Sequence, residues 1–518
     1  MIQYEIRKNA YYDSVTLMLI SKEIKNIEGV GDAIVGMGTD LNKELTVNIG
    51  LKHTLLDAIS PNDFYIAAEV DSDESMKEVI ESVERLLTAK KTAAGSDYRP
   101  ATLNSAVEHF KEANLVIVSI AGQYAEEEVL NALDHDLNVM LFSDNVSIEA
   151  ELRMKQKAVS KELLMMGPDC GTAIINGIPL AFANVVKKGP IGVVGASGTG
   201  TQEVTALIDQ LGSGCSQVIG TGGRDLKSEI GGLMMLQSID ALIEDPETKV
   251  IVLISKPPAP EVAEKILQKV KLTSKPVVVD FIGGNQETIK NAGAYACLTL
   301  EDTARKAVAL ANGMEPVDFI GFTEDESVID ELVQKSLEGI KPTQTNLRAL
   351  YTGGTLADEA MKLLGNTFGG IYSNIPLSPE YELQNLNNLK GHVCLDLGED
   401  QFTVGRPHPM IDPSTRTDRF KTDIDETVAV VLMDVVIGYG SHENPALEAA
   451  QSVNALRASY DEKFVVVASI TGTEGDPQIL SVSKATLEQE GILVLPSNAQ
   501  AVRFVHKLLT ALGGMKHA

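Results

Sequence analysis

The chain has 518 residues, too many for one ordinary hydrophobic core, and about three or four domains are expected. Hydrophobic residues make up 44% of the chain and charged residues 22%, values typical of globular proteins. The formal net charge of −28 argues against a nucleic-acid partner or an anionic membrane surface. Any bound anion is therefore expected to meet backbone N–H groups and a few cations, not a basic face.

The cysteines and the N-terminus indicate a reducing compartment. The four cysteines are far apart in the sequence and form no C-x-x-C pair, so neither a disulfide framework nor a metal site is expected. The N-terminus MIQYEIRKNAYYDS lacks a signal-peptide pattern, and no apolar run is long enough to span a membrane. These features predict a cytoplasmic protein without a membrane partner.

Hydrophobic periodicity predicts an α/β fold made of several parallel-sheet domains of the Rossmann or flavodoxin type. Residues 1–90 alternate short strands and helices and form a small α/β or α+β module. From Asn114 onward, apolar strands alternate with amphipathic helices, which is typical of parallel sheets covered on both faces. We expect three such domains, at 104–186, 187–315 and 345–518.

The sequence GPIGVVGASGTGTQEV at 189–204 is the strongest functional signal. An apolar strand ends in small residues, and a helix begins at about Gln202. This order places free N–H groups and a positive helix end at one point, where a phosphate or carboxylate can bind. A tight turn that needs small residues for packing explains such a loop equally well when it stands alone. The candidate anion-binding residues are Ser197, Gly198, Thr199, Gly200 and Thr201.

A second copy of this design favours the anion-binding interpretation. In LRALYTGGTLADEAM, at 347–361, a strand again ends in small residues before a helix. Glu359 follows Thr355 by four residues, as Glu203 follows Thr199. We expect the two helix starts to face each other across one site, with Gly353, Gly354 and Thr355 in the second loop.

Two cations follow strands of the 187–315 domain. Arg224, after Gly222 and Gly223, is a candidate clamp for a carboxylate or phosphate, although a single arginine is more often structural. Lys256 lies between an apolar strand and two prolines that stiffen its loop. A solvated surface lysine and a functional one are equally compatible with that pattern.

Two further loops hold polar side chains at strand ends. The sequence GRPHPMIDP at 405–413 contains three prolines, which fix the backbone around Arg406 and His408. The sequence GYGSHE at 438–443 follows a strand and precedes a helix, which predicts another anion site. Its candidate residues are Gly438, Gly440, Ser441 and His442.

These motifs resemble known families. The segments MGPDCGTAI, GASGTGTQEV, GTGGRDL and NAGAYACLTLEDTARKAV look like those of the succinyl-CoA synthetase alpha subunit, in the same order. The pattern at 428–510 is similar to the ligase domain of its beta subunit. Over nearly the whole length, including YYDSV, LFSDN, LYTGGTLADEA and TVGRPHPMIDP, the chain more closely resembles the FdrA family. The resemblance implies a CoA-binding-like domain at 104–186 and ligase-like domains at 187–315 and 345–518.

The departures from the synthetase pattern are informative. Asn291 stands where the synthetases have the histidine that carries the phosphoryl group, and an amide cannot take over that chemistry. Lys256 stands in the loop that holds their positioning carboxylate, and no ATP-grasp domain is present. The resemblance thus implies a phosphate cradle without the phosphohistidine shuttle, and Asn291 is retained as a candidate substrate-binding residue.

The FdrA resemblance implies a subunit of a carbamoyltransferase of ureide (allantoin) catabolism, which converts oxalurate and phosphate to oxamate and carbamoyl phosphate. In this hypothesis, Arg224, Lys256 and Arg406 hold an anionic small-molecule substrate, inorganic phosphate or carbamoyl phosphate, and His408 or His442 donates a proton. Partner subunits of a hetero-oligomeric enzyme are expected. One alternative is an acyl-CoA synthetase subunit that binds CoA, and another is a non-catalytic scaffold subunit.

Overall fold

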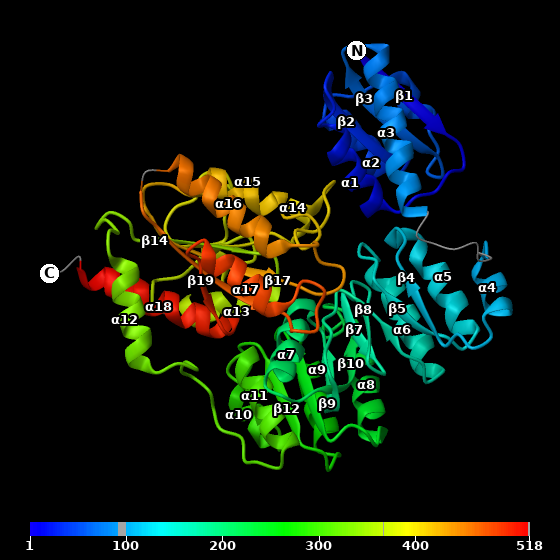
Figure 1. Cartoon of the computed structure of the whole chain (residues 1–518). Helices are drawn as coiled ribbons and strands as arrows, with labels where there is room; N and C mark the ends of the chain where they lie inside the picture. The colour runs from blue at the N-terminus through cyan, green and yellow to red at the C-terminus, as the bar shows by residue number, and fades with distance from the viewer. Residues whose placement is uncertain (92–99, 366, 461, 516–518) are drawn as a thin grey trace. The chain divides into compact units, whose positions relative to one another are not determined.

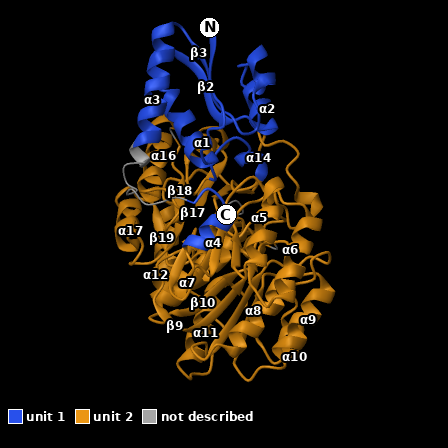
Figure 2. Ribbon diagram, turned by 90° about the vertical axis from the view of Figure 1, so that its right-hand side faces the viewer, with its two compact units in different colours: residues 1–109, 400–408 blue, residues 110–399, 409–518 orange. Residues whose placement is uncertain are grey.

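The computed structural model describes residues 1–91, 100–365, 367–460 and 462–515 and divides into two compact units. Unit 1 comprises Met1–His109 and Asp400–His408, and unit 2 comprises Phe110–Glu399 and Pro409–Ala518 (Figure 2). The fold class is α/β, with several parallel sheets as the periodicity predicts. In the described residues, no helix is long and apolar enough to cross a membrane.

Unit 1 is built on a small antiparallel sheet with the strand order β1-β3-β2. Helices α1 and α3 bury their apolar faces against one side of this sheet. The residues 49–59 cover the other side, where Leu51, Leu56 and Ile59 pack on Tyr65. The elements are β1 (Ile2–Arg7), α1 (Ser14–Ile24), β2 (Val30–Met37), α2 (Asp40–Asn48), η1 (Thr54–Ala58), β3 (Phe64–Val70), α3 (Asp73–Lys91) and α4 (Leu103–His109), with α14 (Asp400–Thr403) from the later segment.

Unit 2 begins with a small parallel sheet in the order β4-β5-β6. This order never reverses, so the sheet has no topological switch point, the place where open α/β sheets bind ligands. The elements are β4 (Leu115–Val118), α5 (Gly122–Asp134), β5 (Asn138–Leu141), α6 (Ile148–Ser160) and β6 (Met165–Met166).

The next sheet has seven strands in the order β13-β12-β11-β9-β10-β7-β8. Its parallel part is flavodoxin-like, because β10 and β11 lie on opposite sides of β9 and leave a switch point there. The hairpin β7–β8 joins this sheet, although we expected residues up to 186 to belong to the preceding domain. The elements are β7 (Thr172–Ile175), β8 (Ile178–Ala181), β9 (Lys188–Gly195), α7 (Gly198–Gln210), β10 (Cys215–Gly220), α8 (Leu233–Glu244), β11 (Val250–Ser255), α9 (Pro260–Val270), β12 (Val277–Phe281), α10 (Gln286–Asn291), β13 (Tyr295–Ala296) and α11 (Leu300–Ala311).

The last sheet repeats this plan with the order β15-β16-β14-β17-β18-β19. Its strands are parallel, and β16 and β17 lie on opposite sides of β14. The first helices of the two large sheets, α7 and α13, therefore both begin at switch points. The elements are α12 (Glu326–Leu337), β14 (Asn346–Tyr351), α13 (Gly354–Gly365), β15 (Tyr372–Ser373), η2 (Pro379–Tyr381), β16 (Val393–Asp396), α15 (Ser414–Asp423), β17 (Val428–Val436), α16 (Pro445–Ser459), β18 (Val465–Thr471), α17 (Leu480–Gln489), β19 (Leu493–Leu495) and α18 (Asn498–Met515).

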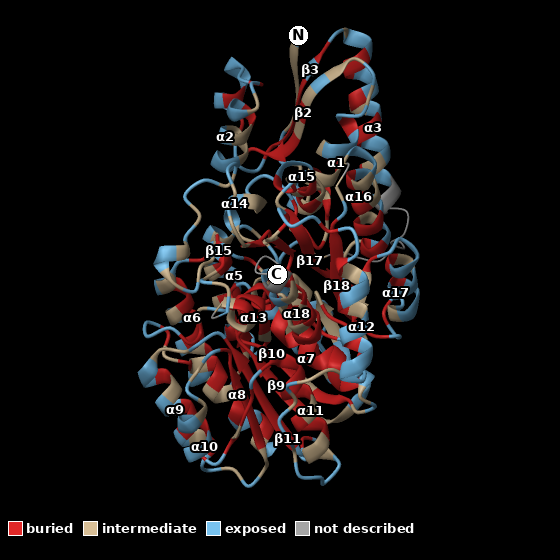
Figure 3. Cartoon of the chain, turned by 90° about the vertical axis from the view of Figure 1, so that its left-hand side faces the viewer, coloured by how far each residue is buried: buried red, intermediate tan, exposed pale blue. Residues whose placement is uncertain are grey.

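The two large sheets share one core. Side chains of β9, α7 and α11 belong to the same buried cluster as those of β14, α13 and α18. The strands and α7 are almost wholly buried, and solvent-exposed residues lie on the outer helices α9 and α10 (Figure 3). A shared core fixes the start of α7 relative to the start of α13.

Candidate functional site

The starts of α7 and α13 contact each other directly. Ser197 Oγ, which caps α7, lies 2.6 Å from Thr355 Oγ1 in the first turn of α13. A Cβ added at Gly353 would lie 2.8 Å from Thr199 Cγ2, so only a residue without a side chain fits there. The N–H groups of a first helical turn have no acceptor within the helix. This contact, called the α7–α13 junction below, therefore brings two sets of N–H donors to one place, as the repeated loop design predicts.

Two buried glutamates fix the helices behind this junction. Glu203 of α7 accepts the backbone N–H of Asn498, the first residue of α18, at 3.1 Å and the hydroxyl of Thr471 at 2.5 Å. Glu359 of α13 accepts the N–H of Leu300, the first residue of α11, at 2.8 Å. Each glutamate thus holds the helix start of the opposite sheet. Burial raises the pKa of Glu203 to about 7 and also raises the pKa of Glu359.

Some amides of the second loop are already engaged. Asp434 of β17 accepts the N–H groups of Thr352 and Gly353, both at 2.8 Å. Arg416 donates to the Asp434 backbone carbonyl at 2.5 Å and lies 3.4 Å from its carboxylate. The expectation that Gly353 binds phosphate through its amide is therefore wrong, because that amide is bonded within the protein. Gly353 instead permits the close contact with Thr199.

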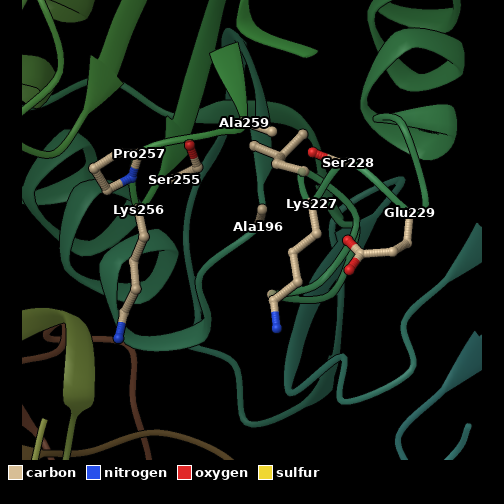
Figure 4. A pocket seen from close by; sticks show the side chains of 10 residues that line it. Ala196, Lys227, Ser228, Glu229, Ser255, Lys256, Pro257 and Ala259 are labelled. Carbon is tan, nitrogen blue, oxygen red and sulfur yellow. The ribbon is translucent and has the colours of Figure 1, made fainter. Parts of the chain in front are cut away.

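A pocket of about 340 Å³ opens beside the junction, at the switch point of the seven-stranded sheet. It is lined from the ends of β9, β10 and β11 by Ala196, Gly223, Lys227, Ser255 and Lys256, among others. Ser255 is 1% exposed, and within the described residues its hydroxyl has no hydrogen-bond partner. Figure 4 shows the Lys227 and Lys256 side chains extending in the same direction. The lining thus combines two ammonium groups with the carboxylate of Glu229 and the buried hydroxyl of Ser255.

Lys256 links the pocket to α13. Its Nζ lies 2.8 Å from Asp358 Oδ2, one turn after Thr355. Burial alone would lower the pKa of Lys256, but the carboxylates of Asp358 and Asp396 raise it, so the amine remains charged. Lys256 is thus available as a fixed cation between the pocket and the junction.

Arg224 does not reach toward the pocket as a free clamp. Its guanidinium lies 2.9 Å from the carboxylate of Glu151 on α6. Glu151 and Asp225 are each 2.8 Å from the fully buried Nζ of Lys155. This ion-pair network attaches α6 to the loop after β10, and a substrate-binding role for Arg224 stays a prediction.

The 438–443 loop is also engaged within the protein. The φ angles of Gly438 and Gly440 are 120° and 81°, in the region that favours glycine. Added side chains there would meet Ala183 and Phe182, and the N–H of Tyr439 donates to the carbonyl of Ala183 at 2.9 Å. These glycines permit close backbone packing, which replaces the anion-binding role expected for them. Ser441 Oγ is buried without a partner among the described residues, and His442 Nδ1 accepts the N–H of Asn444 at 3.2 Å.

Three other predicted site residues lie elsewhere. Arg406 and His408 belong to the segment that forms part of unit 1, where Gly405 packs against Leu45. Burial lowers the pKa of His408 to about 4, so its imidazole is neutral at pH 7 and does not fit the expected role of proton donor. Asn291 is exposed at the end of α10. Arg406 and His408 thus belong to unit 1, whereas Asn291 and the α7–α13 junction belong to unit 2.

The four cysteines do not suit a role as catalytic nucleophiles. All four are buried and free, and burial raises the pKa of Cys170 to about 12. A buried thiol with a raised pKa is a poor nucleophile.

Comparison with known proteins identifies the family. YahF of Escherichia coli K12, described as uncharacterized, is 41% identical over 501 residues, which cover 96% of each chain. The chain belongs to the YahF family. Within this YahF-family chain, residues 186–283 match a CoA-binding domain and residues 350–508 match a CoA-ligase domain. The CoA-binding match therefore covers the pocket, not the range 104–186 where we expected it.

More distant relatives share the ligase-like part. The sulfoacetate-CoA ligase subunit SqwL of an Acholeplasma species is 28% identical over 193 residues, 35% of this chain and 62% of its own. The succinate–CoA ligase alpha subunit of Staphylococcus epidermidis is 27% identical over 176 residues, 33% and 57% of the two chains. An ATP citrate lyase structure from Methanothrix soehngenii aligns with a TM-score of 0.34 at 13% identity, over 80% and 79% of the chains. The succinyl-CoA synthetase resemblance is supported, whereas membership of the FdrA family stays a prediction.

Residues 1–103 match the heavy metal-associated domain of AllF. Soft metals in proteins select thiolate ligands, and this range contains no cysteine. Among the described residues, no group of three or more His, Cys, Asp or Glu side chains is arranged to hold a metal ion. The described residues of unit 1 therefore do not fit a metal site of this kind.

Proposed function

We propose that this chain is a subunit of an acyl-CoA ligase-like enzyme and that the α7–α13 junction binds the phosphoryl group of an acyl phosphate. The observation that carries this proposal is the direct contact of two helix N-termini through Ser197 and Thr355. Helix N-termini favour doubly charged oxygen clusters because their N–H groups and dipoles point outward. CoA-ligase and CoA-binding matches over both helices support the ligase-like chemistry.

The pocket supplies a place for the acyl group. Lys256 and Lys227 attract anionic oxygens, and Ser255 Oγ is free to donate a hydrogen bond. Attack of a CoA thiol on the acyl carbon would form the thioester and release phosphate. Fixed donors at the junction would stabilise the charge that develops on the leaving phosphate oxygen. CoA supplies only the thiol acceptor in this scheme.

A second candidate is carbamoyl transfer, in which phosphate attacks oxalurate and yields oxamate and carbamoyl phosphate. It uses the same phosphate position and needs no CoA. The matches to CoA-binding and CoA-ligase domains favour the ligase-like candidate over this one. Asn291 in place of a phosphorylated histidine is compatible with either candidate.

Two assays of the chain, purified together with the products of neighbouring genes, distinguish these candidates. CoA-dependent thioester formation from acetyl phosphate or a carboxylated acyl phosphate supports the ligase-like function. Carbamoyl phosphate formed from oxalurate and phosphate without CoA supports the second candidate. Failure of both reactions with every partner would contradict both and favour a scaffold subunit.

A lysine variant tests whether the pocket takes part in the reaction. Lys256→Met is expected to lower the rate in the productive assay about 100-fold, a typical loss for one preorganised electrostatic contact. Lys188→Met, which removes an exposed lysine that pairs with Glu247, is the matched control and should retain the wild-type rate. Equal rates for the two variants would show that the pocket takes no part in the reaction.

A further inference from the structure

Asp396 is a buried carboxyl group at the junction that sequence analysis did not select. It is the last residue of β16, and its residue surface is 4% exposed. A Cβ added at Gly354, the first residue of α13, would collide with Asp396 Oδ2. The carboxyl group therefore lies against the helix start that contributes to the junction.

The two oxygens of Asp396 differ in their contacts. Oδ1 accepts the N–H of Gly398 at 2.9 Å. Oδ2 is the atom nearest to a Cβ built on Gly354, so it lies against the first residue of α13. A proton carried on Oδ2 would therefore lie beside the helix start.

The charges around Asp396 favour the protonated form. Burial is the largest cause that raises its pKa, to about 7, and the carboxylates of Glu399 and Asp434 add to it. Lys256 acts in the opposite direction, but it lies 2.8 Å from Asp358 and is shared with that carboxylate. A phosphate dianion at the same helix start would add two negative charges and would further disfavour an ionised Asp396.

We propose that Asp396 takes up a proton when phosphate binds at the α7–α13 junction and donates it to the phosphate oxygen that leaves the acyl group. This inference rests on the proposed function. When the thiol acceptor forms its bond to the acyl carbon, the bond from that carbon to the phosphate oxygen breaks. The electron pair and the Asp396 proton go to that oxygen, giving hydrogen phosphate. The Asp396 carboxylate then accepts the proton released by the thiol, which closes the proton balance.

Calorimetric titration with inorganic phosphate tests this role without turnover. Measurements at about pH 8.5 in buffers of different ionisation enthalpy give the number of protons taken up per phosphate, because binding and protonation are linked. The wild-type chain should take up about one proton, and its affinity should fall about tenfold per pH unit above neutrality. Asp396→Asn should take up none, and its affinity should lose that pH dependence.

Glu399→Gln is the matched control, because Glu399 also faces Asp396 but is not the group against Gly354. This variant should still take up a proton, but its pH dependence should shift to lower pH, because Glu399 helps to raise the pKa of Asp396. Phosphate binding with the same proton uptake in wild type and Asp396→Asn would overturn the role of Asp396 and leave the junction intact. No phosphate binding by the wild type would overturn the junction itself, and with it the proposed function.

Discussion

Substitution of Gly353 by valine is expected to reduce phosphate affinity and acyl phosphate turnover at least about 100-fold, the loss typical when preorganised anion donors are displaced. A Cβ at this position would lie 2.8–2.9 Å from the Thr199 side chain, well inside van der Waals contact. The larger valine side chain must push the starts of α7 and α13 apart. Phosphate titration and the productive assay measure the effect.

Gly365→Val is the matched control for this variant. Gly365 ends α13, and no heavy atom lies within 4 Å of its hypothetical Cβ. The control should bind phosphate as the wild type does. A thermal unfolding curve of each variant separates loss of the site from loss of the fold. Wild-type affinity in folded Gly353→Val would mean that the contact between the two helix starts is not needed for anion binding.

Replacement of Lys155 by methionine is expected to lower the free energy of unfolding of unit 2 by about 3–5 kcal/mol, the cost of leaving buried charges without their partner. Lys155 Nζ is fully buried between Glu151 and Asp225 and also donates to the Thr221 carbonyl at 3.0 Å. Without the lysine, two buried carboxylates face each other. Denaturant unfolding, followed by a probe in unit 2, measures the change.

Lys157→Met provides the comparison, because Lys157 is on the same helix and pairs with Asp134 near the surface. Exposed pairs contribute about 0–1 kcal/mol, so this control should remain close to wild type. A loss equally small for Lys155→Met would show that Arg224 alone balances the buried carboxylates. The same variant should perturb phosphate affinity through the loop after β10, which lines the pocket.

Local sequence order was sufficient to predict the two helix starts. Each has an apolar strand, a few small residues and an amphipathic helix, and the equal spacing of Glu203 and Glu359 marks the repeat. This pattern is local because strand, turn and helix each depend on neighbouring residues. The repeat also predicted that the two helix starts face each other, and the contact of Ser197 with Thr355 agrees with that prediction.

Long-range pairing could not be predicted in the same way. Nothing near Arg224 in the sequence indicates that Glu151, on another element, lies 2.9 Å away. The 405–413 prolines are typical of a rigid functional loop, but the packing of Gly405 on Leu45 assigns residues up to His408 to unit 1. Both expectations depended on tertiary contacts that propensity and spacing do not contain.

Asp396 gave no local signal at all. In VCLDLGED it reads as an ordinary strand-end carboxylate, and only the pairing of β16 with β14 brings it beside α13. The repeated strand–loop–helix design held a partial signal for this position. In each large sheet, the strands on either side of the first strand end beside the start of the first helix. A search of those strand ends for acidic residues would have selected Asp396.

The most direct measurement is an anomalous difference map from crystals of this chain soaked in arsenate, a phosphate analogue with an anomalous scatterer. We expect one dominant peak beside the Ser197–Thr355 contact, within hydrogen-bond reach of the first-turn N–H groups of α7 and α13. A dominant peak elsewhere, with none beside that contact, would contradict the proposed site.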